Sequence, residues 1–354
     1  MKIAIFKISA LGDVLRTTVI LPALKRQTAD VEITWITSPD AMDLLRFNSH
    51  INRLGFLDDG ESAPWRSDEY DWVISLDENY DSSSAASRLR TKSLSGTYIN
   101  SCGDIEYTDD LAAWFGSGLL RPAIAGGLNK ANELKRNNRS TYGEILYECL
   151  GLPAPVFRPQ LNIPVESEQF ARQWLHDQGM NGSRLIVGVN TGAGPRWALK
   201  QWGEEQTASL ALKLADEFNV GVVILGGEAE RTRNSCIVTR TNRSNVIAAP
   251  VDLGLLDFAA IINCCQLIIT SDSLAMHIAL ANRVPVVAFF GPTSAAEIDV
   301  YENGKKVVTS LPCKCCYLNT CTIHPNCMED ISVEKMFSAC KDLLKAQYGA
   351  TRSE

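Results

Sequence analysis

A polar run at 270–273 (TSDS) follows a short apolar run at 267–269, and a helical apolar pattern comes directly after it. A second apolar run at 284–290 then predicts another strand. Ligands bind at such strand ends in open α/β sheets, and the first N–H groups of a helix favour phosphate. Asp272 and Ser273 are also good helix N-caps, so a capped crossover helix without a ligand is an equal alternative.

A second polar turn follows the apolar run 185–190 (LIVGVN) and contains Thr191 and Gly192, with Lys200 further on. Small residues after a strand allow the backbone to approach a phosphate, and a lysine supplies charge. The pattern is neither a Walker motif nor G-x-G-x-x-G. The next strand pattern, 220–225, is followed by Glu228 and Glu230, and acidic residues there suit ribose hydroxyls.

A carboxylate also follows the first predicted strand, at residues 2–8. Gly12 permits a tight turn, which places Asp13 at the start of a helix, facing the carboxyl end of that strand. The commoner role of such a residue is to complement the helix dipole. In a cleft, the same carboxylate can act as a general base.

The elements that position these residues form two series of alternating strands and helices. In the first series, 32–37 and 72–76 read as further strands, with a helix at 40–47 between them. A proline-containing passage at 151–164 predicts a linker, and the second series ends in a helix at 332–348. We therefore expect two doubly wound α/β domains, 1–164 and 165–354, with a cleft between them. The last helix is a candidate to pack back on the first domain.

Composition and net charge argue against some classes of function. The chain has 354 residues and a net charge of -7, which argues against a broad basic surface for nucleic acid. No apolar run reaches the roughly 18 residues needed to span a bilayer, and the N-terminus reads as a strand rather than a signal peptide. A cytoplasmic protein is expected. The irregular stretch 114–139 is basic and contains glycines, so it is either an exposed loop and helix start or a contact to a membrane surface or substrate.

Five cysteines lie close together near the end of the chain. Their spacing does not match a paired C-x-x-C knuckle, so zinc or a cluster is the weaker alternative to free thiols or a disulfide-prone loop. The sequence does not decide whether these cysteines bind a metal, form disulfides or stay free. They are Cys313, Cys315, Cys316, Cys321 and Cys327.

Several of these stretches together resemble glycosyltransferase family 9, which includes the ADP-heptose:lipopolysaccharide heptosyltransferases. The similar segments occur in the family's order, at 7–15 (KISALGDVL), 191–202 (TGAGPRWALKQW), 272–277 (DSLAMH) and 290–293 (FGPT). The cysteine-rich segment ending in Cys327-Met328 is also similar to one in many members. The resemblance covers nearly the whole chain.

The resemblance implies a GT-B fold, with two Rossmann-like domains facing a central cleft. It implies an inverting transferase that needs no metal or cofactor and moves a heptose, or a related sugar, from ADP-heptose to a lipid-linked saccharide of lipopolysaccharide. Asp13 would be the catalytic base, with Lys7 and Arg16 on the acceptor side. The residues implied for the nucleotide sugar are Thr191, Gly192, Lys200, Glu230, Asp272, Ser273, Leu274 and His277. Because the implied acceptor is linked to a lipid, the resemblance also implies that the protein contacts the inner face of the cytoplasmic membrane.

Three positions depart from this pattern or stay ambiguous. Many members carry glycine where this chain has Leu274, and some heptosyltransferases carry histidine at the position of Arg16. His277 is as well explained by packing and hydrogen bonding as by phosphate contact. The alternatives are a nucleotide-sugar enzyme of similar fold with another donor, an epimerase or hydrolase without a large acceptor, and a binding protein that has lost catalysis.

Overall fold

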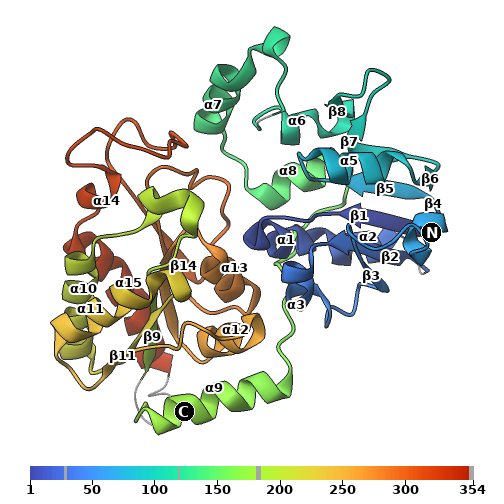
Figure 1. Cartoon of the computed structure of the whole chain (residues 1–354). Helices are drawn as coiled ribbons and strands as arrows, with labels where there is room; N and C mark the ends of the chain where they lie inside the picture. Colours follow the sequence, from blue (N-terminus) through green and yellow to red (C-terminus); the bar gives the residue numbers. More distant parts are fainter. Residues whose placement is uncertain (28–29, 119, 181–184, 351–354) are drawn as a thin grey trace. The chain divides into compact units, whose positions relative to one another are not determined.

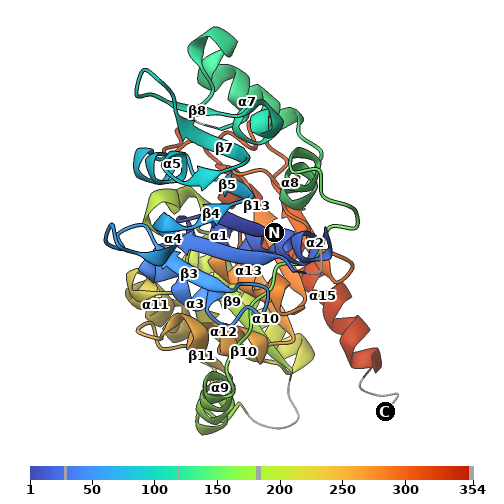
Figure 2. The same cartoon turned by 90° about the vertical axis from the view of Figure 1, so that its right-hand side faces the viewer.

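The computed structural model describes residues 1–27, 30–118, 120–180 and 185–350. The chain forms two compact units, Met1–Asn162 (unit 1) and Ile163–Glu354 (unit 2), whose elements are labelled in Figures 1 and 2. The domain boundary predicted at 164/165 lies two residues beyond this division. No helix among the described residues is both long and apolar enough to cross a membrane.

Unit 1 is organised around a six-stranded sheet in the order β3-β2-β1-β5-β7-β8. The first five strands are parallel, and β8 pairs with β7 in the antiparallel direction. The chain builds outward from β1 to β3 and then returns to place β5 on the other side of β1. This reversal creates a topological switch point between β1 and β5. The strands are β1 (Lys2–Phe6), β2 (Glu32–Thr37), β3 (Arg53–Phe56), β5 (Trp72–Ser75), β7 (Leu94–Ile99) and β8 (Ile105–Tyr107), with a separate short pair β4 (Glu69–Tyr70) and β6 (Arg90–Thr91).

The central strands of unit 1 consist largely of buried apolar residues. This is expected of parallel strands that are covered on both faces of the sheet. Phe6, Ile36 and Val73 belong to one apolar cluster, where the ring of Trp65 packs edge-on against Phe6 at 5.9 Å between centroids. The helices are α1 (Leu11–Thr17), α2 (Leu21–Gln27), α3 (Met42–Leu45), α4 (Pro64–Ser67), α5 (Tyr80–Ser87), α6 (Ala112–Phe115), α7 (Gly127–Asn137) and α8 (Tyr142–Cys149).

Unit 2 has a fully parallel six-stranded sheet in the order β11-β10-β9-β12-β13-β14. Its chain path repeats that of unit 1, so its switch point lies between β9 and β12. The strands are β9 (Ile186–Asn190), β10 (Gly221–Leu225), β11 (Val246–Ala248), β12 (Leu267–Ser271), β13 (Val286–Phe290) and β14 (Gly304–Val308).

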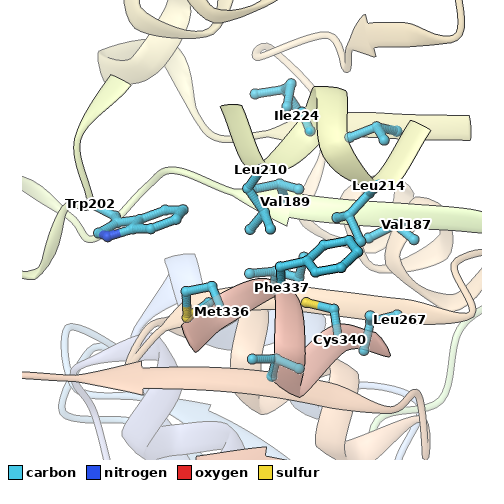
Figure 3. Packing of buried hydrophobic residues seen from close by; sticks show 14 of the residues in the cluster. Val187, Val189, Trp202, Leu210, Leu214, Ile224, Leu267, Met336, Phe337 and Cys340 are labelled. Carbon is cyan, nitrogen blue, oxygen red and sulfur yellow. The ribbon is translucent and has the colours of Figure 1, made fainter. Parts of the chain in front are cut away.

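Helices cover both faces of the unit 2 sheet (Figure 1). One face carries α10 (Glu204–Phe218), α11 (Arg231–Thr241) and α15 (Val333–Ala350), and the other carries α9 (Val165–Asp177), α12 (Leu255–Asn263) and α13 (Leu274–Ala281). A short helix, α14 (Cys327–Asp330), precedes α15. Figure 3 shows Leu214 of α10 and Phe337 and Cys340 of α15 packing over the strand residues Val187 and Leu267. The last helix is therefore part of the core of its own unit.

The structure confirms the strands expected at 32–37, 72–76, 185–190 and 220–225, and the helix expected at 332–348. Ser332 caps the start of this helix, because its hydroxyl oxygen accepts a hydrogen bond from the N–H of Lys335 at 3.2 Å. The expectation of an irregular stretch at 114–139 was incomplete, because that stretch contains α7.

Candidate functional site

Asp13 lies in the first turn of α1, directly beyond the carboxyl end of β1. Its Oδ1 atom is 2.9 Å from Nη2 of Arg16, one helical turn further on, and its side chain is 38% exposed. The guanidinium of Arg16 in turn lies 3.7 Å from the ring centroid of Tyr142. The carboxylate is thus held from one side and open to solvent on another, as a group that accepts a proton from a ligand must be.

Tyr142 supports this arrangement and was not recognised as a site residue from the sequence. Its hydroxyl is 2.6 Å from Oγ1 of Thr17, which also donates to the carbonyl oxygen of Asp13 at 2.6 Å. The ring packs edge-on against Trp114. Burial raises the pKa of Tyr142 to about 12, so the phenol is neutral at ordinary pH. A single tyrosine so far along the chain from Asp13 carries no spacing signal.

Lys7 joins the two strands at the switch point of unit 1. Its Nζ atom donates to Oδ1 of Asp77 at 2.8 Å and to the carbonyl oxygen of Ser9 at 2.6 Å, and both charged side chains are buried. Burial alone would lower the pKa of Lys7, but the charges of Asp77 and Asp13 outweigh it and the net pKa is raised. Asp77 also accepts the backbone N–H of Ile8, so it fixes the end of β1. Asp77, which follows β5, was not recognised as the partner of Lys7 from the sequence.

In unit 2, Lys200 and Asp272 form the centre of the candidate site. The buried Nζ of Lys200 lies 3.0 Å from Oδ2 of Asp272 and 3.0 Å from its carbonyl oxygen. His277, also buried, has Nε2 3.9 Å from the other carboxylate oxygen. This carboxylate therefore joins a lysine and a histidine, beyond the simple helix-capping role considered from the sequence.

Asn190 organises the backbone around the start of α13. Its amide Nδ2 donates to the carbonyl oxygen of Gly192 at 2.8 Å and lies 3.1 Å from both Oγ1 of Thr270 and Oγ of Ser273. Ser273 is the N-cap of α13, yet within the described chain its hydroxyl makes no capping hydrogen bond. The first N–H groups of a helix have no partner within it, so those of Leu274 and the next residue are placed to bind an anion.

Glu230 lies under the turn that follows β9. Its Oε2 accepts the N–H of Gly227 at 3.0 Å, and Gln201 is 3.4 Å from Oε1. A Cβ atom added at Gly192 would be only 3.2 Å from Oε2 of Glu230, so the close approach of this turn suits glycine. Glu228 differs, because it is exposed and forms a bidentate ion pair with Arg231.

Thr191 has a supporting position. Its hydroxyl lies 2.5 Å from Oδ1 of Asn234 in α11 and 3.1 Å from the carbonyl oxygen of Leu225. The side chain is buried, so its contribution to a ligand site is through the backbone turn that it holds. Neither Asn234 nor Asn190 was predicted, since a single asparagine carries no spacing signal.

The cysteine-rich segment packs next to this site. The N–H of Cys315 donates to the carbonyl oxygen of Gly291 at 2.9 Å, and that of Tyr317 donates to Pro292 at 2.8 Å. No disulfide joins the eleven cysteines. Among the described residues, no three His, Cys, Asp or Glu side chains are grouped as metal ligands. Burial, followed by the nearby thiols of Cys316 and Cys321, raises the pKa of Cys327 to about 11.

Comparison with known proteins identifies the family. Residues 133–326, more than half of the chain, match glycosyltransferase family 9 (heptosyltransferase). The chain belongs to glycosyltransferase family 9. It is 31% identical over 171 residues to lipooligosaccharide heptosyltransferase 2 of Campylobacter jejuni, covering 47% of this chain and 53% of that one. It is also 31% identical over 159 residues to lipopolysaccharide heptosyltransferase 2 of Escherichia coli, covering 42% of each chain. In these alignments the chain spans about half the length of its relatives.

Solved structures of family 9 share the fold along the chain. A family 9 glycosyltransferase from Veillonella parvula superposes with a TM-score of 0.78 at 20% identity, covering 98% of this chain and 97% of that one. The heptosyltransferase II of E. coli superposes with a TM-score of 0.65 at 19% identity, covering 98% and 100%. The two units of this chain are thus the two Rossmann-like domains of a GT-B fold, and both clusters of candidate residues lie at switch points of their sheets.

Proposed function

We propose that this family 9 protein is an inverting, metal-independent glycosyltransferase that moves a heptose, or a related sugar, from ADP-heptose to a lipid-linked saccharide. The observation that carries the proposal is the cation of Lys200, held 3.0 Å from Asp272 where α13 begins. A buried lysine beside helix amides suits a diphosphate. Curated relatives named as heptosyltransferases support the choice of sugar and acceptor.

Unit 2 takes the donor in this proposal. Lys200, the turn at Gly192 and the amides that open α13 bind the diphosphate, and Glu230 accepts hydrogen bonds from the ribose hydroxyls. His277 is placed beside the phosphates through its contact with Asp272. These groups stabilise the negative charge that grows on the leaving diphosphate as the glycosidic bond breaks.

Unit 1 takes the acceptor. The acceptor hydroxyl oxygen attacks the anomeric carbon, its proton passes to the carboxylate of Asp13, and the bond to the diphosphate oxygen breaks with its electron pair leaving on ADP. Arg16 orients that carboxylate at 2.9 Å. Lys7 is held by Asp77 on the acceptor side, where its charge also interacts with that of Asp13. The acceptor is expected at the inner face of the cytoplasmic membrane.

Calorimetry of the purified chain with ADP, UDP, GDP and CDP, each in magnesium and in EDTA, tests this function. We expect selective binding of ADP that EDTA leaves unchanged, and turnover of ADP-heptose under the same conditions. Selective binding of another nucleotide would reassign the donor. Binding of no nucleotide, or binding that depends on a divalent ion, would contradict the proposed donor site.

A further inference from the structure

An exposed apolar segment stands out on unit 1, at residues 122–128 (PAIAGGL), which we call the apolar tip. Ile124 is 100% exposed and Leu128 is 54% exposed. Single exposed apolar residues are ordinary, but a run of neighbouring ones marks a surface that meets an apolar partner. The tip runs into α7, which lies to one side of the sheet of unit 1 in Figure 1.

The apolar tip has a defined backbone. Arg121 donates through Nε to the carbonyl oxygen of Ala125 at 2.7 Å and through Nη1 to that of Gly116 at 2.9 Å. Gly126 has φ of +98°, and a Cβ atom there would lie 2.7 Å from Cβ of Lys130. A left-handed glycine at this position turns the chain from the tip into α7. Ile124 therefore lies on a turn whose backbone conformation is fixed by hydrogen bonds.

Basic residues flank the apolar tip in the sequence. Between 121 and 139 the chain carries five basic residues and one acidic residue, although the whole protein has a net charge of -7. Ala131 is the buried residue of α7, and Leu134 is 37% exposed. The basic residues are Arg121, Lys130, Lys135, Arg136 and Arg139. This combination matches the two features of an anionic lipid surface, an apolar interior and negatively charged headgroups.

We propose that the apolar tip and α7 dock this protein on an anionic bilayer, with Ile124 and Leu128 entering the headgroup region and the basic residues of α7 contacting lipid phosphates. Lipid is favoured over a protein partner because a small exposed apolar projection flanked by basic residues matches an anionic bilayer without needing a shaped counterpart. The proposal extends the proposed function, since a lipid-linked acceptor lies at such a surface.

Vesicle co-sedimentation of the full chain tests the docking surface. We expect the protein to bind vesicles of phosphatidylglycerol and phosphatidylethanolamine, and to bind phosphatidylcholine vesicles at least about tenfold more weakly, because each basic residue near an anionic surface adds attraction. Ile124→Asp should weaken binding to anionic vesicles by about tenfold or more, because it replaces an inserting side chain by a like charge. Arg136→Glu with Arg139→Glu should weaken it as well and flatten its salt dependence.

Two variants in unit 2 provide matched controls. Val165→Asp places an acid at another exposed apolar side chain, 59% exposed, and Arg240→Glu reverses an exposed cation. Both should bind vesicles as the wild type does. Equal losses in the controls and the tip variants, or no preference for anionic lipid, would overturn the docking surface. So would binding seen only when the vesicles carry an acceptor glycolipid. Calorimetry with ADP on the same samples tests the donor site separately.

Discussion

Arg16 and Asp13 form an ion pair of 2.9 Å across one turn of α1, and Arg16 is stacked on Tyr142. The same spacing occurs at the end of α3, where Arg46, the residue after the helix, lies 3.2 Å from Asp43. Only the first pair lies at the switch point between β1 and β5. The position in the sheet, rather than the ion pair itself, is what marks Asp13 as the candidate base.

Asp13→Asn should lower turnover by roughly 10² to 10⁴-fold, because a positioned general base contributes about that much. Its affinity for ADP should stay unchanged, because Asp13 and the nucleotide residues belong to different units. Asp43→Asn, which breaks the matched ion pair, should leave turnover intact. Steady-state kinetics and calorimetry on both variants measure this, and full turnover in Asp13→Asn would remove Asp13 from the mechanism.

Lys200→Ala should weaken ADP binding by about 1.5–3 kcal/mol, the range for a hydrogen bond that involves a charged group. The loss should be smaller for adenosine, which has no diphosphate. Lys305→Ala removes a partly exposed lysine that is paired with Asp342, and it serves as the control. Calorimetric affinities for ADP that agree between Lys200→Ala and the wild type would exclude Lys200 from the phosphate site.

Glu230→Ala should reduce the preference for ADP over 2′-deoxy-ADP, because the proposed partner of the carboxylate is a ribose hydroxyl. Loss of one charge-assisted hydrogen bond corresponds to about 1.5–3 kcal/mol. Glu228→Ala should keep the wild-type preference, since Glu228 is exposed and paired with Arg231. The comparison uses binding of both nucleotides to each variant. A preserved preference in Glu230→Ala would assign the ribose to other residues.

Alkaline pH should destabilise unit 1. Burial raises the pKa of Tyr142 from 10.0 to about 12, so the folded state holds its proton where the unfolded chain loses it. The resulting stability is present below pH 10 and is lost as pH rises to about 12, a change of about 2–3 kcal/mol. The pKa of Lys7 is also raised in the folded state, so its contribution to stability is likewise lost as pH rises. Denaturant unfolding at several pH values should show a shallower decline for Tyr142→Phe, and an unchanged slope would contradict this role.

Phe337→Ala should destabilise unit 2 by about 3–5 kcal/mol, as expected for removing a buried aromatic side chain. Phe337 packs against Phe218, with 5.8 Å between ring centroids, and belongs to the cluster of Figure 3. Leu318→Ala, at an exposed position, should change stability by less than about 0.5 kcal/mol. Urea unfolding of unit 2 measures the change in stability for both variants. Similar midpoints for the two variants would show that α15 does not stabilise the core.

The central strands were predictable because their apolar runs are long enough to be buried on both faces, as at 185–190 and 220–225. The outer strands were not. β14 has the sequence GKKVV and is only partly buried, and β3 is four residues long, so neither gives an apolar run. Edge strands are recognised through their neighbours, and no single sequence pattern contains that information.

The candidate site residues also fall into those that the sequence predicted and those that it did not. Asp13, Lys200 and Asp272 lie directly after predicted strands or in motifs similar to those of the family, so their types and positions were informative. Tyr142 and Asn234 act through contacts with residues 125 and 43 positions away in sequence. Such pairings are created by folding, and local spacing cannot predict them.

The indole of Trp202, two residues after Lys200, donates to the carbonyl oxygen of Ile331 at 2.9 Å, across 129 residues of sequence. On a ribosome, the turn that holds Lys200 is therefore made long before the segment that supports it. Unit 1 can complete its sheet while unit 2 is still being synthesised, because domains fold as units from the N-terminal side. Capture of a nucleotide by unit 2 must wait until the segment that contains Ile331 has emerged.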